Sequence, residues 1–308
     1  MLDFKRMRVL REVAQQGSFS AAATALSYTQ PAVSQQIAAL EREAGTRLVE
    51  RSARGVRLTE AGTALVGHAE AILARLAAAE AELEAIAGLR GGRMRLASFA
   101  TAGATIMPLA IATFRQRHPG VELSLVEAEP EDSIPALRAG ELELALTFEP
   151  NAVVSEDGVE HEHLLDDPMY AALPADHRLA GRAKVRLEDL ASEPWIQPTD
   201  NCPCSRLVTD ACAARGFQPH VAFESDDYLA VQGLVAAGVG VSLIPDLALS
   251  SVRDDIVIRP LSPRPIIRRV MAATLPGALR SPSTVAMVEI LREVAESYPL
   301  HHSALAAA

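Results

Sequence analysis

The sequence predicts an α/β protein of three parts: an all-α N-terminal module, a long linking helix and a two-lobed α/β domain. Three observations lead to this prediction. Short helical patterns fill the first 58 residues, an unbroken helical pattern covers residues 59–90, and strands alternate with helices over residues 91–308. We therefore expect domain boundaries near residues 58 and 90.

The composition is that of an ordinary globular protein. Of 308 residues, 49% are apolar and 22% are charged, and no apolar run reaches the roughly 18 residues that a membrane span needs. Lys5, Arg6 and Arg8 interrupt the start of the chain, which excludes the apolar core of a signal peptide. The few cysteines suit a reducing compartment, so we predict a cytoplasmic protein with no membrane partner.

Charge is distributed unevenly along the chain. The net charge is −10 overall, but residues 1–60 hold nine basic and six acidic side chains, a balance of +3. The other 248 residues therefore carry −13. This asymmetry predicts a small module that meets a polyanion and a larger acidic module with another task.

The N-terminal module has the pattern of a helix-turn-helix. Asp3 is a good N-cap for a first helix that stops near Gly17, and a second helix covers about residues 20–26. A third helix covers about residues 30–43 and carries no carboxylate before Glu41. A helix that enters the major groove needs such a face, because carboxylates repel phosphates.

The outward face of the third helix carries short and amide side chains. Gln35 suits an adenine edge, and Ala32 suits a thymine methyl group. Two strand-like segments, 48–51 and 56–58, follow and predict a wing whose arginines reach DNA phosphates or a minor groove. The alternative is a polar, solvated helix in a helical bundle.

These sixty residues resemble the LysR-type transcriptional regulators. The resemblance is carried by Phe19-Ser20-Ala21-Ala22-Ala23, by the run from Gln30-Pro31-Ala32-Val33-Ser34-Gln35-Gln36-Ile37 to Leu40-Glu41, by Gly45-Thr46-Arg47-Leu48 with Glu50-Arg51, and by Leu58-Thr59-Glu60-Ala61-Gly62. Val49 departs from the phenylalanine that is usual there. The resemblance implies a winged helix-turn-helix on double-stranded promoter DNA, in a homodimer or, as is usual, a tetramer. It also implies base contacts from Gln30, Pro31, Ser34 and Gln35, and contacts to the backbone or the wing's groove from Ser18, Ser20, Thr29, Arg51 and Arg54.

The long helix carries a heptad seam. Its apolar positions are spaced alternately four and three residues apart, which keeps one stripe facing a partner helix. The spacing predicts dimerisation through this helix, and the alternative is an amphipathic helix lying on its own domain. The seam consists of Leu65, Ala69, Ile72, Leu76, Ala79, Leu83 and Ile86.

Residues 91–308 predict a parallel sheet with covered faces, arranged as two α/β lobes. The domain resembles the effector-binding domain of the LysR family, which is similar to periplasmic binding proteins. The resemblance implies a first lobe of about 91–165 and 268–308, and a second of about 166–267.

A ligand in such sheets lies beyond the carboxyl ends of the strands, near helix N-termini. This rule predicts a site for a small-molecule effector of unknown identity. Thr101 and Thr199 would each be a contact or only a helix cap, while Asp226 favours a cap. The acidic side chains weaken the expectation of an anionic effector. The predicted site consists of Ser98, Phe99, Thr101, Ala102, Glu149, Gln197, Pro198, Thr199, Cys204 and Asp226.

Three cysteines, Cys202, Cys204 and Cys212, lie close together. A thiol near a helix N-terminus and an arginine favours the thiolate, so one alternative is a peroxide-responsive LysR-type regulator that uses Cys204 and Cys212. The other alternative is that the cysteines are small apolar fillers. We expect neither a zinc site nor a metal at His161 and His163, because no further ligands converge there.

No enzyme signature occurs in the sequence, and we expect neither a catalytic activity nor a cofactor. The rival from another class is a two-lobed solute-binding protein or enzyme with an appended helical module. Together, these observations predict a transcriptional regulator whose two lobes bind an effector.

Overall fold

The computed structural model describes residues 2–52, 55–86, 92–149, 158–199 and 202–300. The chain divides into two compact units. Unit 1 contains residues 1–89 together with 138–141, and unit 2 contains 90–137 and 142–308. Among the described residues, no helix is both long enough and apolar enough to cross a membrane.

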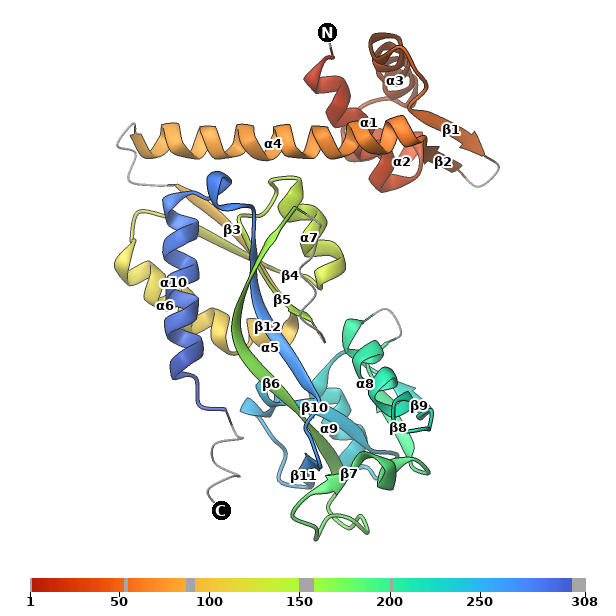
Figure 1. Cartoon of the computed structure of the whole chain (residues 1–308), viewed down its shortest axis with the longest axis vertical. Helices are drawn as coiled ribbons and strands as arrows, with labels where there is room; N and C mark the ends of the chain where they lie inside the picture. Colours follow the sequence, from red (N-terminus) through yellow and green to blue (C-terminus); the bar gives the residue numbers. More distant parts are fainter. Residues whose placement is uncertain (1, 53–54, 87–91, 150–157, 200–201, 301–308) are drawn as a thin grey trace. The chain divides into compact units, whose positions relative to one another are not determined.

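Unit 1 contains the three predicted helices, a hairpin and the long helix (Figure 1). The predicted caps are confirmed: Asp3 accepts a hydrogen bond from the Lys5 amide at 2.8 Å, and Gly17 ends the first helix at a positive φ of 60°. The bounds are α1 (Phe4–Gln16), α2 (Phe19–Ala25), α3 (Gln30–Ala44), β1 (Val49–Ser52), β2 (Gly55–Leu58) and α4 (Glu60–Ile86).

The apolar sides of α1, α2 and α3 form one core, to which Leu10, Val33 and Leu40 contribute fully buried side chains. The first turns of α4 also pack into this core, through Leu65 and Ala69. The expected dimer seam is therefore wrong at its start, because these two side chains are already buried within their own chain. Only the later seam positions are left for a partner.

Gly62 is required where α4 begins. A Cβ atom at this position would lie 2.0 Å from the Leu48 carbonyl oxygen, the same oxygen that accepts a hydrogen bond from the Thr59 amide at 3.0 Å. The glycine thus lets α4 approach the segment that precedes the hairpin. Gly67, one turn further along, has no such neighbour.

Unit 2 is built on a mixed sheet, and the expectation of a parallel sheet is wrong for half of it. Strand β3 pairs in parallel with β4 and β5, whereas β12 returns from the far end of the unit and runs antiparallel to β5 and β6. The strand order is β4-β3-β5-β12-β6-β11-β7, with β10 also on β6. The bounds are β3 (Arg93–Ser98), β4 (Glu122–Glu127), β5 (Leu144–Glu149), β6 (Glu160–Pro174), β7 (Val185–Arg186), β10 (Ser242–Pro245), β11 (Ile256–Ser262) and β12 (Ile267–Thr274).

Strand β6 belongs to both lobes. Residues 160–168 pair with β12, and residues 169–174 pair with β10 and β11. Figure 1 shows β6 and β12 running side by side along the unit. A separate parallel pair, β8 (Pro194–Gln197) and β9 (His220–Glu224), completes the second lobe.

Helices cover the sheet and follow its strands. Helices α6 and α10 pack on one another in the first lobe (Figure 1). The short helix α5 follows β3, and Leu187–Leu190 form a 3-10 turn. The α-helices are α5 (Ala100–Gly103), α6 (Ile106–Arg117), α7 (Pro130–Arg138), α8 (Pro203–Ala213), α9 (Tyr228–Ala236) and α10 (Pro282–Ser297).

Substitution of Gly62 tests the close contact at the start of α4. We expect Gly62→Ala to lower the free energy of unfolding of unit 1 by about 1–3 kcal/mol, because the new methyl group meets a backbone oxygen. Gly67→Ala is the matched control on the exposed side of the same helix, where alanine adds about 1 kcal/mol of helix stability. Urea denaturation followed by circular dichroism measures both. Equal effects of the two substitutions would contradict the packing argument.

Candidate DNA-binding and effector sites

The predicted base-reading face lies on the first half of α3. Gln30, Pro31 and Gln35 are exposed, and Ala32 and Ser34 are half-buried on the same side. Its neighbour Gln36 is not free, because it accepts a hydrogen bond from Arg6 Nε at 3.2 Å. The structure therefore presents an amide-rich face without a carboxylate, which a helix in the major groove requires.

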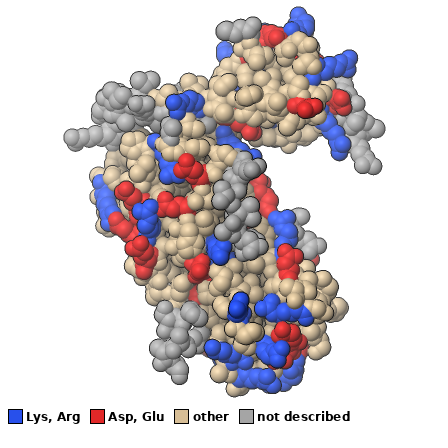
Figure 2. Space-filling view, in the orientation of Figure 1, with Lys and Arg blue, Asp and Glu red and all other residues tan. Residues whose placement is uncertain are grey.

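Three of the residues expected to contact the DNA backbone lie at or next to the N-termini of α2 and α3. Ser18 and Thr29 are the N-caps of α2 and α3, and Ser20 is exposed. On the hairpin, the backbone of Arg51 pairs with Val56, but its side chain and the whole of Arg54 lie outside the described residues. Figure 2 shows Lys and Arg side chains at the outer edges of this unit.

Beyond the core of unit 1, the described large apolar side chains of the α4 seam are exposed. Ile72 and Leu76 are 46% and 47% exposed, which is high for large apolar side chains. The side chain of Leu83 lies outside the described part of the helix.

The centre of unit 2 is a buried ion pair between Arg268 of β12 and Asp167 of β6. Arg268 Nε and Nη2 lie 2.9 Å and 2.5 Å from Asp167 Oδ2, and both side chains are almost completely buried. The Leu247 amide donates to Asp167 Oδ1 at 3.1 Å. Burial by itself would lower the pKa of Arg268, but the charges of Asp167 and Cys204 raise it above its ordinary value, so the guanidinium stays protonated.

Two aromatic rings enclose the same guanidinium. Its carbon atom lies 4.8 Å from the centroid of Phe99 and 4.9 Å from that of Phe148, and the rings meet edge to face. Arg268 Nη2 also donates to the Thr101 hydroxyl at 2.7 Å. Arg268 thus joins β6 to the end of β3 and the start of α5.

The Cys204 sulfur is another partner of Arg268, at 3.4 Å from Nη1. Cys204 lies in the first turn of α8 and is 2% exposed. The hydrogen bond from the Cys202 thiol is the largest cause that lowers the pKa of Cys204 to about 6, and the Arg268 charge helps it outweigh burial. The same hydrogen bond raises the pKa of Cys202 above its ordinary value.

A pocket of about 530 Å³ lies beside this cluster, between α5 and the start of α9. Its wall is acidic, and one member, Glu129, has a pKa that burial raises to about 7. Glu129 Oε2 is buried and has no hydrogen-bond partner among the described residues. The charged and polar lining comprises Thr101, Glu127, Glu129, Asp226, Asp227 and Gln232.

Two predicted site residues, Thr101 and Asp226, line this pocket. Thr199 instead binds Asp226, donating from its amide and its hydroxyl at 2.9 Å each. The expectation that Asp226 caps a helix is wrong, because the N-cap of α9 is Asp227. Through its hydrogen bonds with Thr199, Asp226 instead fixes the segment that follows β8.

The remaining predicted residues are more deeply placed. Ala102 and Phe99 belong to the apolar core, and Ser98 donates to a neighbouring carbonyl at 3.1 Å. Gln197 and Pro198 are buried, and Gln197 Nε2 finds no partner within the described ranges. The side chain of Glu149 lies outside the described residues. Ala102 therefore serves the core and not a ligand.

Cys204 and Cys212, the two cysteines of the peroxide-responsive alternative, lie apart in the structure. Cys204 packs in one apolar core and Cys212 in another, eight residues further along α8. Eight helical residues span about 12 Å, far beyond the reach of a disulfide. Burial raises the pKa of Cys212 to about 12, which disfavours its thiolate.

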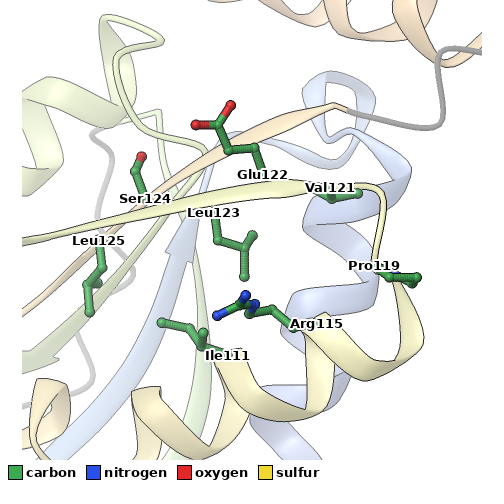
Figure 3. Close-up of a pocket in the computed structure, with 8 residues that line it drawn as sticks. All are labelled: Ile111, Arg115, Pro119, Val121, Glu122, Leu123, Ser124 and Leu125. Atoms are coloured by element: carbon green, nitrogen blue, oxygen red, sulfur yellow. The ribbon is translucent and has the colours of Figure 1, made fainter.

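No group of three or more potential metal ligands occurs in the part of the chain that the structure describes. His163 instead lies 2.9 Å from Asp166. A second pocket, of about 420 Å³, lies between α6 and the edge strand β4, with Ile111 and Arg115 pointing from the helix towards the strand (Figure 3).

Comparison with known proteins shows the family to which the chain belongs. Residues 4–63 match the bacterial regulatory helix-turn-helix family of LysR type, and residues 87–296 match the LysR substrate binding domain. The chain belongs to the LysR family of transcriptional regulators. The predicted fold class, a winged helix-turn-helix followed by a two-lobed α/β domain, is thereby confirmed.

Relatives match the LysR-type chain over most of its length. The HTH-type transcriptional regulator CbbR of Rhodospirillum rubrum is 32% identical and covers 95% of this chain and 97% of its own. A "Probable hydrogen peroxide-inducible genes activator" of Mycobacterium avium is 37% identical over 79% of this chain and 78% of its own. A full-length OxyR variant of Pseudomonas aeruginosa has the same fold, with a TM-score of 0.67, 26% identity and coverage of 96% and 95%.

The sequence did not lead us to Arg268 and Asp167, although a signal was present. Each is one of two adjacent charges, Arg268-Arg269 and Asp166-Asp167, inside a strand. Because neighbouring side chains of a strand point to opposite faces, one charge of each pair must point inward. Two inward charges of opposite sign predict a buried ion pair.

Substitution of Arg268 tests this pair. We expect Arg268→Met to lower the free energy of unfolding of unit 2 by about 3–5 kcal/mol, because it leaves the Asp167 charge buried without its partner. The matched control Arg269→Met removes the neighbouring, half-buried arginine and should change stability by about 0.5 kcal/mol or less. Fluorescence of Trp195, the single tryptophan of the chain, follows urea unfolding of this unit. Similar losses in both variants would argue against the ion pair.

Proposed function

We propose that this LysR-type regulator reads promoter DNA with the exposed face of α3. The observation that carries the proposal is the juxtaposition of Gln30, Ser34 and Gln35 at the N-terminal half of one rigid helix, free of carboxylates. We infer contacts to the phosphate backbone from Ser18, Ser20 and Thr29 and from the wing arginines Arg51 and Arg54. A regulator of promoters acts where the chromosome lies, so we place it in the cytoplasm.

We further propose that an effector binds in the acidic pocket beside Arg268. Thr101 and Asp226 line it, and each is tied to a different part of unit 2. A ligand that prefers one arrangement of these parts shifts the population of the two-lobed domain, which is the physical requirement for regulation. We assign the chain no catalytic step. We keep boundaries near residues 58 and 90 for its three parts.

Self-association follows from two separate apolar faces. One is the exposed seam of α4 at Ile72 and Leu76. The other lies on α6 and the edge strand β4, where Leu109, Leu125 and Val126 are 40–51% exposed next to the pocket of Figure 3. Two faces that each pair with a copy of themselves allow a closed tetramer, so we propose a dimer through α4 and a tetramer through the second face.

The double variant Ser34→Ala/Gln35→Ala tests the reading face. We expect promoter affinity to fall by at least about tenfold, because each lost base contact costs about 1–3 kcal/mol. The matched control Gln15→Ala removes an exposed amide from α1 and should leave affinity unchanged. The DNA is first selected from random duplexes with the native protein, and affinity is then measured by fluorescence anisotropy. Failure of the native protein to select any sequence would overturn the proposed function.

The seam of α4 is tested by Ile72→Glu/Leu76→Glu. We expect buried charges to abolish pairing through this helix, so that sedimentation velocity shows a smaller species and promoter affinity falls with it. Ala64→Glu/Ala71→Glu adds the same charges to exposed α4 positions outside the seam and should preserve the native oligomer. An unchanged oligomer in the first variant would exclude the seam.

A further inference from the structure

We propose that Cys202 and Cys204 form a reversible dithiol–disulfide pair that is oxidised by small disulfides through thiol–disulfide exchange. The proposal goes beyond promoter binding and does not depend on it. It rests on the placement of two sulfurs that are separated only by Pro203, in the described segment 202–206. Of the three cysteines, these two alone lie together, since Cys212 packs in a different core.

The two sulfurs have complementary surroundings. Cys202 is the N-cap residue of α8 and is half-buried, so it is the more accessible of the two cysteines. Cys204 follows in the first turn, is 2% exposed, and faces the Arg268 guanidinium at 3.4 Å. A helix N-terminus and an arginine both stabilise a thiolate, so the buried sulfur holds the negative charge while the outer sulfur holds the shared proton.

This arrangement fixes the order of the exchange. The Cys202 proton passes to the Cys204 sulfur, and the Cys202 thiolate attacks one sulfur of the small disulfide RSSR, releasing RS⁻. Cys204 then gives its proton to this RS⁻, and its thiolate attacks the Cys202 sulfur and expels the second RS⁻. The products are the Cys202–Cys204 disulfide, RSH and RS⁻, and the protein has lost two electrons to RSSR.

Oxidation changes what Arg268 binds. In the reduced protein this guanidinium contacts Cys204 of α8, Thr101 of α5 and Asp167 of β6. The disulfide removes the negative charge at Cys204 and leaves Asp167 as the one anionic partner among these three. The redox state of the pair is thereby linked to the contact that joins α8 to α5.

Mass spectrometry of the full-length protein tests the pair. The native protein is incubated with oxidised glutathione, unfolded in urea with iodoacetamide so that the buried thiols also react, and digested with trypsin. Cleavage after Arg206 separates a peptide that holds Cys202 and Cys204 (residues 187–206) from one that holds Cys212 (residues 207–215). We expect the first peptide to lose two hydrogen atoms and its alkylation, and the second to stay alkylated.

Two variants test the order of the steps, and a third is the control. Cys204→Ser should retain glutathione on Cys202, whereas Cys202→Ser should bind little, because its two remaining cysteines are buried. Cys212→Ala should form the disulfide as the native protein does. Full alkylation of both cysteines in the native protein, or a cross-link between the two peptides, would overturn the proposal. None of these readouts uses DNA, so they are independent of whether the chain binds a promoter.

Discussion

The two-lobed unit depends on one buried positive charge. Arg268 is held in an apolar core, where an unpaired guanidinium would cost several kcal/mol, and it is tolerated only because Asp167, Thr101 and the Cys204 sulfur surround it. These partners come from segments far apart in the sequence. The charge therefore specifies which strand and which helices meet at the centre of the unit, and a ligand in the neighbouring pocket binds beside this network.

The acidic wall of that pocket gives the site its electrostatic character. Glu127, Glu129, Asp226 and Asp227 all line it, and burial already raises the pKa of Glu129 to about 7. Near neutral pH a good part of this carboxyl group is protonated, so the pocket loses negative charge as the pH falls through 7. Both carboxylate oxygens of Asp226 already accept hydrogen bonds from Thr199. This part of the pocket wall therefore stabilises the protein itself.

The sequence predicted the helical module closely because its signals are local. Asp3, Ser18 and Thr29 cap three helices, and Gly17 and Gly45 end two of them, as the residue types require. It predicted less of unit 2, where strand pairing depends on residues that are distant in the chain. The antiparallel course of β12, the strand β11 and the partners of Arg268 are such long-range features. Of the expected effector residues, Thr101 and Asp226 line the pocket, whereas Ala102 serves the core.

The packing of Leu65 and Ala69 against α1–α3 has a mechanical consequence. It fastens the first three turns of α4 to the same core that positions the reading helix, and Gly62 permits the close contact at its start. Helices α4 and α3 then move together as one rigid body. Any rotation of α4 about its axis therefore rotates α3 through the same angle.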